Sequence, residues 1–172
     1  MNVAAAEITR CVLERDDKVR ILDADALNII AGEHIDYKGS REGQIIITPH
    51  IMEMSRLTGK TVADIKEHMI ESAKEYAIQH SCICILKDAR TVVTDGQKVY
   101  INCTGNDGMS TGGCGDVLTG LIAGMTAMGL DAFEAACLSV YVHGKAGDYA
   151  ASGKGRAGMT AADISVSYTH LR

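Results

Sequence analysis

The sequence lacks an excess of positive charge: 17 lysines and arginines face 22 aspartates and glutamates, and the formal net charge is -5 at pH 7. Without a basic stripe the chain has nothing to hold a polyanionic backbone, so we expect no nucleic acid partner. The first 20 residues also lack a long apolar run, which excludes a signal peptide and a membrane span there. We therefore expect a cytoplasmic protein with no membrane partner.

A metal-binding pattern is also missing. No two cysteines are spaced as C-x-x-C, and the histidines do not cluster with the cysteines, which disfavours structural zinc. Cys82 and Cys84 alternate within the apolar run SCICILK, as small residues on one face of a strand do. We interpret them as reduced core thiols rather than as part of a disulfide framework, and we predict no metal-ligating residues.

What the sequence does have is the balance of one globular domain: 172 residues, of which 47% are hydrophobic and 23% charged. Apolar runs of strand length alternate with segments of helical period, which predicts an α/β fold with a mostly parallel sheet. Strands are predicted in residues 18–25, 43–50 and 81–87, and a helix over 61–80 precedes the third of them. The pair Asp95-Gly96 in TVVTDGQKVYIN predicts an antiparallel hairpin.

Further helices are predicted from about Cys114 to Met128 and from Asp131 to Ala151, and Thr160 with Asp163 predicts a capping box on a short last helix. We expect the chain to enter almost directly into its first strand. The closing residues SVSYTHLR have neither a helical period nor a strand pattern. We interpret both ends as those of an incomplete domain.

The stretch GNDGMSTGGCGDVLTG, residues 105–120, gathers six glycines ahead of a helix, and such a cluster marks unusual dihedrals or a close ligand. Gly108 to Gly112 formally match the hydrolase elbow G-x-S-x-G, but the strand that should run into Ser110 is missing. No G-x-G-x-x-G follows the first strand, and no P-loop is present. The cluster is neither of the two standard phosphate loops.

The remaining hypothesis makes GGCGD an anion hole. Gly112, Gly113 and Gly115 allow successive N–H groups to converge where the helix that begins near Cys114 adds its positive dipole end. Charge developing on a phosphoryl group would be stabilised there. Asp116, in the first helical turn, is placed to take a proton from a hydroxyl nucleophile. The alternative is that Asp116 only caps the helix.

The motifs of this chain resemble those of one family in both order and spacing. They are ILDADALN, ITPHIMEMSRLTG, LKDARTVVTDG, GNDGMSTGGCGDVLTGLIAGM, VYVHGKAGDYAA and GMTAADI. The family is the ADP- or ATP-dependent NAD(P)H-hydrate dehydratases of the ribokinase-like superfamily, and the likeness runs from Val19 to Ile164. It implies a layered ribokinase-like fold, with a mostly parallel sheet, an antiparallel hairpin and helices on both faces.

The resemblance implies repair of hydrated NADH and NADPH. A nucleotide, ADP or ATP with Mg²⁺, would phosphorylate the added ring hydroxyl, and loss of phosphate would restore the double bond. Asp116 is then the catalytic base, and Gly113, Cys114 and Gly115 supply N–H donors. The nucleotide-binding residues implied are Lys87, Asp88, Ala89, Arg90, Thr91, Asn106 and Gly115. Asp88 stands where the family usually has glycine, and Asn106 either binds the nucleotide or shapes its loop.

The residues implied for binding the hydrated nucleotide are His50, Glu53, Asp25, Asn28 and Asp116. Ile51 and Met52 stand where the family usually has Pro-Gly, so the turn after His50 is expected to differ in shape. Asp25 and Asn28 follow a strand end, where ligands gather in open α/β sheets; helix capping is their equal alternative. His143 and Asp148 lie on a helix that we interpret as structural.

The chain also departs from the family. Family members carry a substantial segment before the strand that matches KVRILDAD, and we expect this chain to be N-terminally truncated. The predicted domains are a dehydratase domain over residues 1–164 and a non-family tail over 165–172. A homo-oligomer and pairing with an NAD(P)HX epimerase are further expectations. The alternatives are an inactive nucleotide-binding fragment and a sibling kinase for a small vitamin-precursor alcohol.

Overall fold

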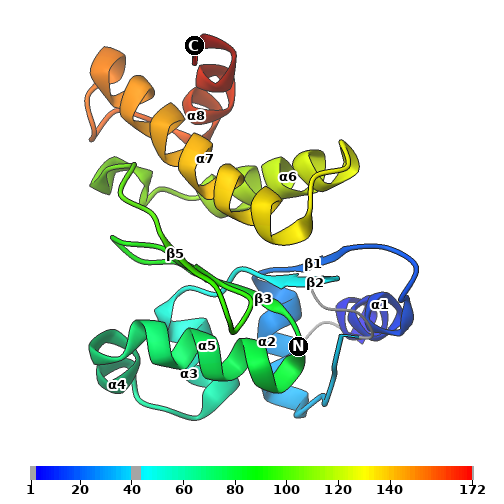
Figure 1. Cartoon of the computed structure of the whole chain (residues 1–172). Coiled ribbons are helices and arrows are strands. Elements are labelled where there is room, and N and C mark those ends of the chain that lie inside the picture. Colours follow the sequence, from blue (N-terminus) through cyan, green and yellow to red (C-terminus); the bar gives the residue numbers. More distant parts are fainter. Residues whose placement is uncertain (1–2, 40–43, 172) are drawn as a thin grey trace. The chain divides into compact units, whose positions relative to one another are not determined.

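The computed structural model describes residues 3–39 and 44–171 of the chain (Figure 1). The chain forms two compact units, Met1–Ile101 and Asn102–Arg172. The first unit contains, in chain order, α1 (Val3–Glu14), β1 (Arg20–Leu22), α2 (Asp25–Glu33), β2 (Ile45–Ile47), α3 (Ile51–Thr58), α4 (Val62–Glu67), α5 (Met69–His80), β3 (Ile83–Leu86), β4 (Val92–Thr94) and β5 (Val99–Ile101).

The first unit is built on a five-stranded sheet with the order β1-β2-β3-β4-β5. The pairs β1–β2 and β2–β3 are parallel, and β3–β4 and β4–β5 are antiparallel. The hairpin turns at Asp95-Gly96, where Gly96 has a φ of 94° and the Asp95 carboxylate accepts from the Gln97 and Lys98 N–H groups. The predicted parallel sheet with an antiparallel hairpin is therefore confirmed.

The core of this unit lies between one face of the sheet and the helices that Figure 1 shows beside it, α2 to α5. Because side chains alternate along a strand, Ile45 and Ile47 enter this core while Ile46 points to the other face, and all three are fully buried. Cys84 is fully buried and its thiol is free, so the prediction of a reduced core thiol is confirmed. Burial raises the pKa of that thiol.

Two expectations for the first unit are wrong. The chain does not enter directly into a strand, because α1 precedes β1, with Ala6 and Thr9 on its buried side. The helix expected over 61–80 is two helices, α4 and α5, which meet at His68 with a φ of −126° and a ψ of 50°. The helical period is nearly continuous through this break, so periodicity alone does not reveal it.

The second unit contains η1 (Asp107–Met109), α6 (Cys114–Ala127), α7 (Ala132–Lys154), α8 (Ala161–Ser167) and η2 (Tyr168–His170). Its core joins Cys114 of α6, Ala146 and Ala150 of α7, Met159, and Ile164 of α8. The predicted capping box is present, because the Asp163 carboxylate accepts from the Thr160 N–H and hydroxyl.

Residues 165–170 are helical, although the closing stretch SVSYTHLR lacks a helical period. Ser167 is buried, and the Tyr168 hydroxyl lies 2.7 Å from His143 Nδ1 on α7. Packing against α7 therefore decides their conformation where the local pattern does not. Across residues 3–39 and 44–171, no helix combines the length and the apolar character that a bilayer crossing demands.

Candidate functional site

Two of the predicted site residues, His50 and Lys87, lie at the carboxyl ends of parallel strands, at the same edge of the sheet as Asp23. Asp23 follows β1, His50 follows β2 by three residues, and Lys87 follows β3. His50 and Lys87 form an isolated parallel bridge, and the Lys87 N–H donates to the Pro49 carbonyl at 2.8 Å. The carboxyl edge of a parallel sheet is where ligands bind in open α/β folds.

Lys87 is held by a partner that the sequence did not identify. Its Nζ lies 3.0 Å from Asp23 Oδ1, and the two side chains are only 23% and 13% exposed. Asp23 lies within the predicted strand 18–25 and is not among the predicted site residues. Its pairing depends on strand order, because β2 separates β1 from β3 in the sheet. A partly buried pair of this kind fixes the direction of the ammonium group.

The turn after β1 is strained and braced. Ala24 has a φ of 46°, a conformation that residues with a side chain rarely adopt. Its N–H donates to Asp23 Oδ1, and its carbonyl accepts from Asn28 Nδ2 at 3.1 Å. The Asn28 Oδ1 accepts from Arg56 Nη1 at 2.7 Å. The Asn28 amide thus braces this turn, while Asp25 lies exposed in the first turn of α2.

His50 and Glu53 form a capping box on α3. His50 Nδ1 accepts from the Met52 and Glu53 N–H groups, and Glu53 Oε2 accepts from the His50 N–H at 2.8 Å. Since Nδ1 accepts, the neutral ring carries its proton on Nε2, 3.4 Å from Glu53 Oε1. Glu53 is buried while His50 is exposed, so His50 is the member of the pair that a ligand can reach.

The segment that follows Lys87 is a turn between β3 and β4. Asp88, Ala89 and Arg90 are exposed, and the Thr91 hydroxyl reaches the Asp88 carbonyl at 3.4 Å. Its backbone forms no helix or strand before Val92. Asp88, which stands where the resemblance implies a glycine, therefore lies on a solvent-exposed turn.

The glycine cluster lies in the second unit and leads into α6. Gly113 is the N-cap residue, with a φ of 89° and no side-chain capping bond. The Cys114 N–H reaches the Thr111 carbonyl at 3.4 Å, and the Val117 N–H donates to the Gly113 carbonyl. Within the described residues, neither Gly115 nor Asp116 donates its N–H to a loop carbonyl. These two donors suit an anion at the positive end of the helix dipole.

The residues around this helix start fit a phosphate group. A Cβ added at Gly112 would meet nothing within 4 Å, so the approach is open there. Cys114 is buried, and burial raises the pKa of its thiol, so the residue contributes its backbone and not a thiolate. Asp116 is exposed in the first turn. Ser110 follows η1 and not a strand, so the hydrolase elbow is excluded.

A network on α7 holds the loop that precedes this cluster. Asp148 Oδ2 accepts from the Gly105 N–H at 3.0 Å, and Asp148 Oδ1 accepts from Asn106 Nδ2 at 3.1 Å. Asn106 Oδ1 in turn accepts from the Gly108 N–H at 3.1 Å. Asp148 therefore contacts the predicted loop directly, which sequence reasoning missed because its motif HGKAGD lies inside a long helix.

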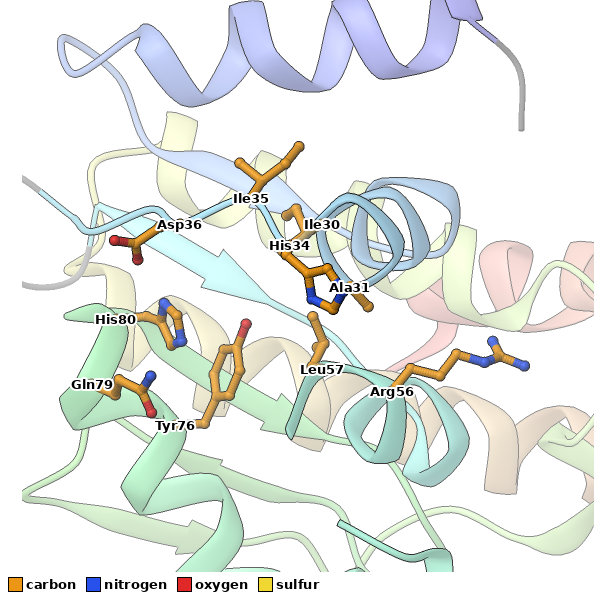
Figure 2. A pocket seen from close by; sticks show the side chains of 10 residues that line it. All are labelled: Ile30, Ala31, His34, Ile35, Asp36, Arg56, Leu57, Tyr76, Gln79 and His80. Carbon is orange, nitrogen blue, oxygen red and sulfur yellow. The ribbon is translucent and has the colours of Figure 1, made fainter. Parts of the chain in front are cut away.

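A separate pocket of about 210 Å³ lies among the C-terminal parts of α2, α3 and α5 (Figure 2). The residues that line it include His34, Asp36, Arg56, Tyr76 and His80. His80 stacks on Tyr37 and Tyr76, with ring centroids 4.7 and 4.2 Å apart. None of the predicted site residues lines this pocket. No group of three His, Cys, Asp or Glu able to hold a metal occurs within residues 3–39 and 44–171.

The fold and the glycine-capped helix place the chain in a broad class. A ribokinase-like superfamily protein from Enterococcus faecalis matches it with a TM-score of 0.85 and 25% identity, over 99% of this chain and 58% of that one. The fold class is therefore ribokinase-like, as predicted. The family profile Carb_kinase, described as NAD(P)H-hydrate dehydratase, matches residues 1–170. The chain belongs to the NAD(P)H-hydrate dehydratase family.

Two further relatives carry that activity in their names. The bifunctional NAD(P)H-hydrate repair enzyme Nnr of Moorella thermoacetica is 45% identical over 163 residues, which are 94% of this chain and 30% of that protein. The ADP/ATP-dependent NAD(P)H-hydrate dehydratase of Bacillus subtilis, co-crystallized with ATP/Mg²⁺ and soaked with CoA, has a TM-score of 0.82 and 34% identity. The match covers 92% of this chain and 57% of that one, so the chain is much shorter than its relatives.

Proposed function

We propose that the protein dehydrates hydrated NADH and NADPH in a nucleotide-dependent reaction. The observation that carries the proposal is the start of α6, where glycine replaces a capping side chain and Asp116 stands in the first turn. Membership of the dehydratase family supports it. The names of the Moorella and Bacillus relatives support the same reaction class.

Asp116 accepts the proton of the ring hydroxyl as that oxygen takes up a phosphoryl group. We assign the anion hole to the N–H groups of Gly113, Cys114 and Gly115, which stabilise the negative charge that develops on the group in transfer. Of these three, the Cys114 N–H also reaches the Thr111 carbonyl at 3.4 Å. When bound, ADP or ATP with Mg²⁺ supplies the phosphoryl group that turns a poor leaving group, hydroxide, into a good one. Phosphate then departs with the electrons of the C–O bond, the neighbouring ring carbon loses a proton to solvent, and the electrons of that C–H bond restore the ring double bond.

The nucleotide is assigned to Lys87, Asp88, Ala89, Arg90, Thr91 and Gly115, and to Asn106 either as a direct contact or as the residue that shapes its loop. Lys87 supplies a cation at a strand end, directed by Asp23 at 3.0 Å. The open turn from Asp88 to Thr91 offers backbone groups to the nucleotide. Mg²⁺ would be carried by the nucleotide phosphates and would neutralise their charge during transfer.

The hydrated nicotinamide nucleotide is assigned to His50, Glu53, Asp25, Asn28 and Asp116. His50 offers an exposed ring. The buried Glu53 holds the His50 backbone N–H in the α3 cap and lies 3.4 Å from Nε2 of the ring. Asn28 acts through the turn at Ala24, since its amide is committed to that carbonyl and to Arg56. Asp25 is exposed beside it at the start of α2.

The wider setting is also part of the proposal. We infer a cytoplasmic homo-oligomer that works beside an NAD(P)HX epimerase. The name of the Moorella relative, a bifunctional repair enzyme, supports a second activity beside the dehydratase. The domain is assigned to residues 1–164 and the tail to 165–172, although the family profile extends to residue 170.

The test is recovery of NADH absorbance from hydrated NADH with Mg²⁺ and either ADP or ATP. The control is Asp116→Asn, with folding checked by circular dichroism. Nucleotide-dependent recovery that this variant loses, by about 100-fold or more, supports Asp116 as the base. A folded wild-type chain that binds nucleotide without recovery is a nucleotide-binding fragment, and phosphorylation of a vitamin-precursor alcohol would identify a sibling kinase instead.

A further inference from the structure

The loop from Asn102 to Met109 is seated on the middle of α7. The Thr104 hydroxyl donates to the Tyr141 carbonyl at 3.0 Å. A Cβ added at Gly144 would lie 2.2 Å from Thr104 Oγ1 and 2.7 Å from its backbone carbon, and one at Gly147 would lie 2.3 Å from Met109 Sδ. Because Gly144 and Gly147 have no side chains, the loop can pack directly against this part of α7.

On the same helix, the carboxylate of Asp148 hydrogen-bonds to the loop. Each of its carboxylate oxygens accepts one hydrogen bond from the loop, from the Gly105 N–H and from Asn106 Nδ2. Gly105 has a φ of 98°, so this N–H is presented by a backbone conformation that favours glycine. Hydrogen bonds to an ionised acceptor are about twice as strong as neutral ones. These two hydrogen bonds fix the position of the turn at Gly105 and Asn106.

The loop that Asp148 holds continues into the glycine cluster. Asn106 caps η1 by accepting from the Gly108 N–H, and the Ser110 N–H donates to the Asp107 carbonyl at the end of η1. Met109 also packs against the core that holds Cys114, the first residue of α6. The loop and the helix start thus share one support, α7.

We propose that Asp148 is a positioning residue for nucleotide binding and that it acts through Asn106. The inference rests on the proposed function and deepens it: Asn106 shapes the loop and does not itself contact the nucleotide. Asn106 Oδ1 is occupied by Gly108, and Nδ2 already donates to Asp148. In addition to packing in the core, α7 then positions the loop that leads to the start of α6.

The pair allows an exchange that tests this role. In Asp148→Asn, an amide NH₂ faces the NH₂ of Asn106, and in Asn106→Asp two carboxylates face each other. The double variant Asp148→Asn with Asn106→Asp restores every bond, because the new amide donates to the new carboxylate and still accepts from Gly105. The matched control is Asp131→Asn, which alters the carboxylate that caps the same helix by accepting from the Phe133 and Glu134 N–H groups.

The measurements are titration of the full chain with Mg²⁺ and ADP or ATP, and amide exchange at Gly105 and Gly108. We expect each single variant to weaken nucleotide binding about tenfold or more, as loss of a charged hydrogen bond does, and to speed exchange at both glycines. We expect the double variant to return both quantities to near the wild-type values. In an active enzyme, the KM for nucleotide rises while the KM for hydrated NADH stays unchanged.

Two results would overturn the proposal. Faster exchange with unchanged nucleotide affinity gives Asp148 a structural role only, and a double variant that recovers exchange without affinity places Asn106 in contact with the nucleotide. If Asp148→Asn does not fold, Asn106→Asp and the double variant decide the matter. If the chain binds nucleotide but never regenerates NADH, only the proposed function is wrong. The role of Asp148 is still decided by the titration and the amide exchange.

Discussion

The ammonium of Lys87 lies 3.0 Å from the carboxylate of Asp23, across the end of the strand that separates them. The two residues are 64 positions apart in sequence. The pair joins the ends of β1 and β3 beside His50, at the sheet edge where ligands bind in this class of fold. This ion pair fixes the direction of the Lys87 ammonium group.

Replacing Lys87 with methionine should destabilise the fold by about 1–3 kcal/mol, because it leaves the Asp23 carboxylate partly buried without its partner. Nucleotide affinity should fall at least about tenfold. Urea unfolding and nucleotide titration measure the two effects. The control is Lys60→Met, which breaks an exposed pair with Glu75 and should cost less than about 1 kcal/mol. Equal losses in both variants would contradict the assignment.

Gly113→Ala should destabilise the protein by about 1–2 kcal/mol, because an alanine is strained at a φ of 89°. Its Cβ would also lie 3.2 Å from that of Ala161. Nucleotide binding should weaken as the cap shifts. Gly120→Ala on the same helix meets no atom within 4 Å and should stabilise by up to about 1 kcal/mol. Thermal unfolding measures the stability of both variants. An unchanged stability of Gly113→Ala would contradict the prediction.

Gly144→Ala should cost about 3 kcal/mol or more, since its methyl group would meet backbone atoms of Thr104 that cannot rotate away. The companion is Gly153→Ala, near the end of the same helix, where nothing lies within 4 Å and a gain of up to about 1 kcal/mol is expected. The free energy of unfolding of each variant, from urea titration, provides the comparison. Similar values for both would show that the loop does not rest on Gly144.

The α8 cap should make stability depend on acidic pH. A hydrogen bond from Lys154, followed by those from Thr160, lowers the pKa of Asp163 to about 2, against 3.8 when it is unperturbed. Because the folded pKa is the lower one, this stabilisation is present above about pH 4 and disappears as the pH falls toward 2. The stability difference between wild type and Asp163→Asn should shrink over that window. A difference that stays constant from pH 6 to pH 2 would refute it.

Much of the fold could be predicted from local patterns. Short apolar runs predicted β1, β2 and β3, the Asp95-Gly96 pair predicted the hairpin, and Thr160 with Asp163 predicted the last cap. The break at His68, the helix α1 and the helical tail could not be predicted in this way. The helix α1 buries Ala6 and Thr9, and the tail packs on α7 through Tyr168 and His143; a window of neighbouring residues does not contain such contacts.

For the site, the sequence by itself determined which chemical groups are present. The glycine cluster and Asp116 lie at the start of a helix, and Lys87 and His50 follow strands. Only the tertiary structure decided their partners. Asp23 reaches Lys87 because parallel strands end at one edge, and Asp148 reaches Asn106 because two glycines let a loop approach α7. Hydrogen bonds and ion pairs form between atoms about 3 Å apart in space, and that proximity is set by strand order and helix packing rather than by spacing along the chain.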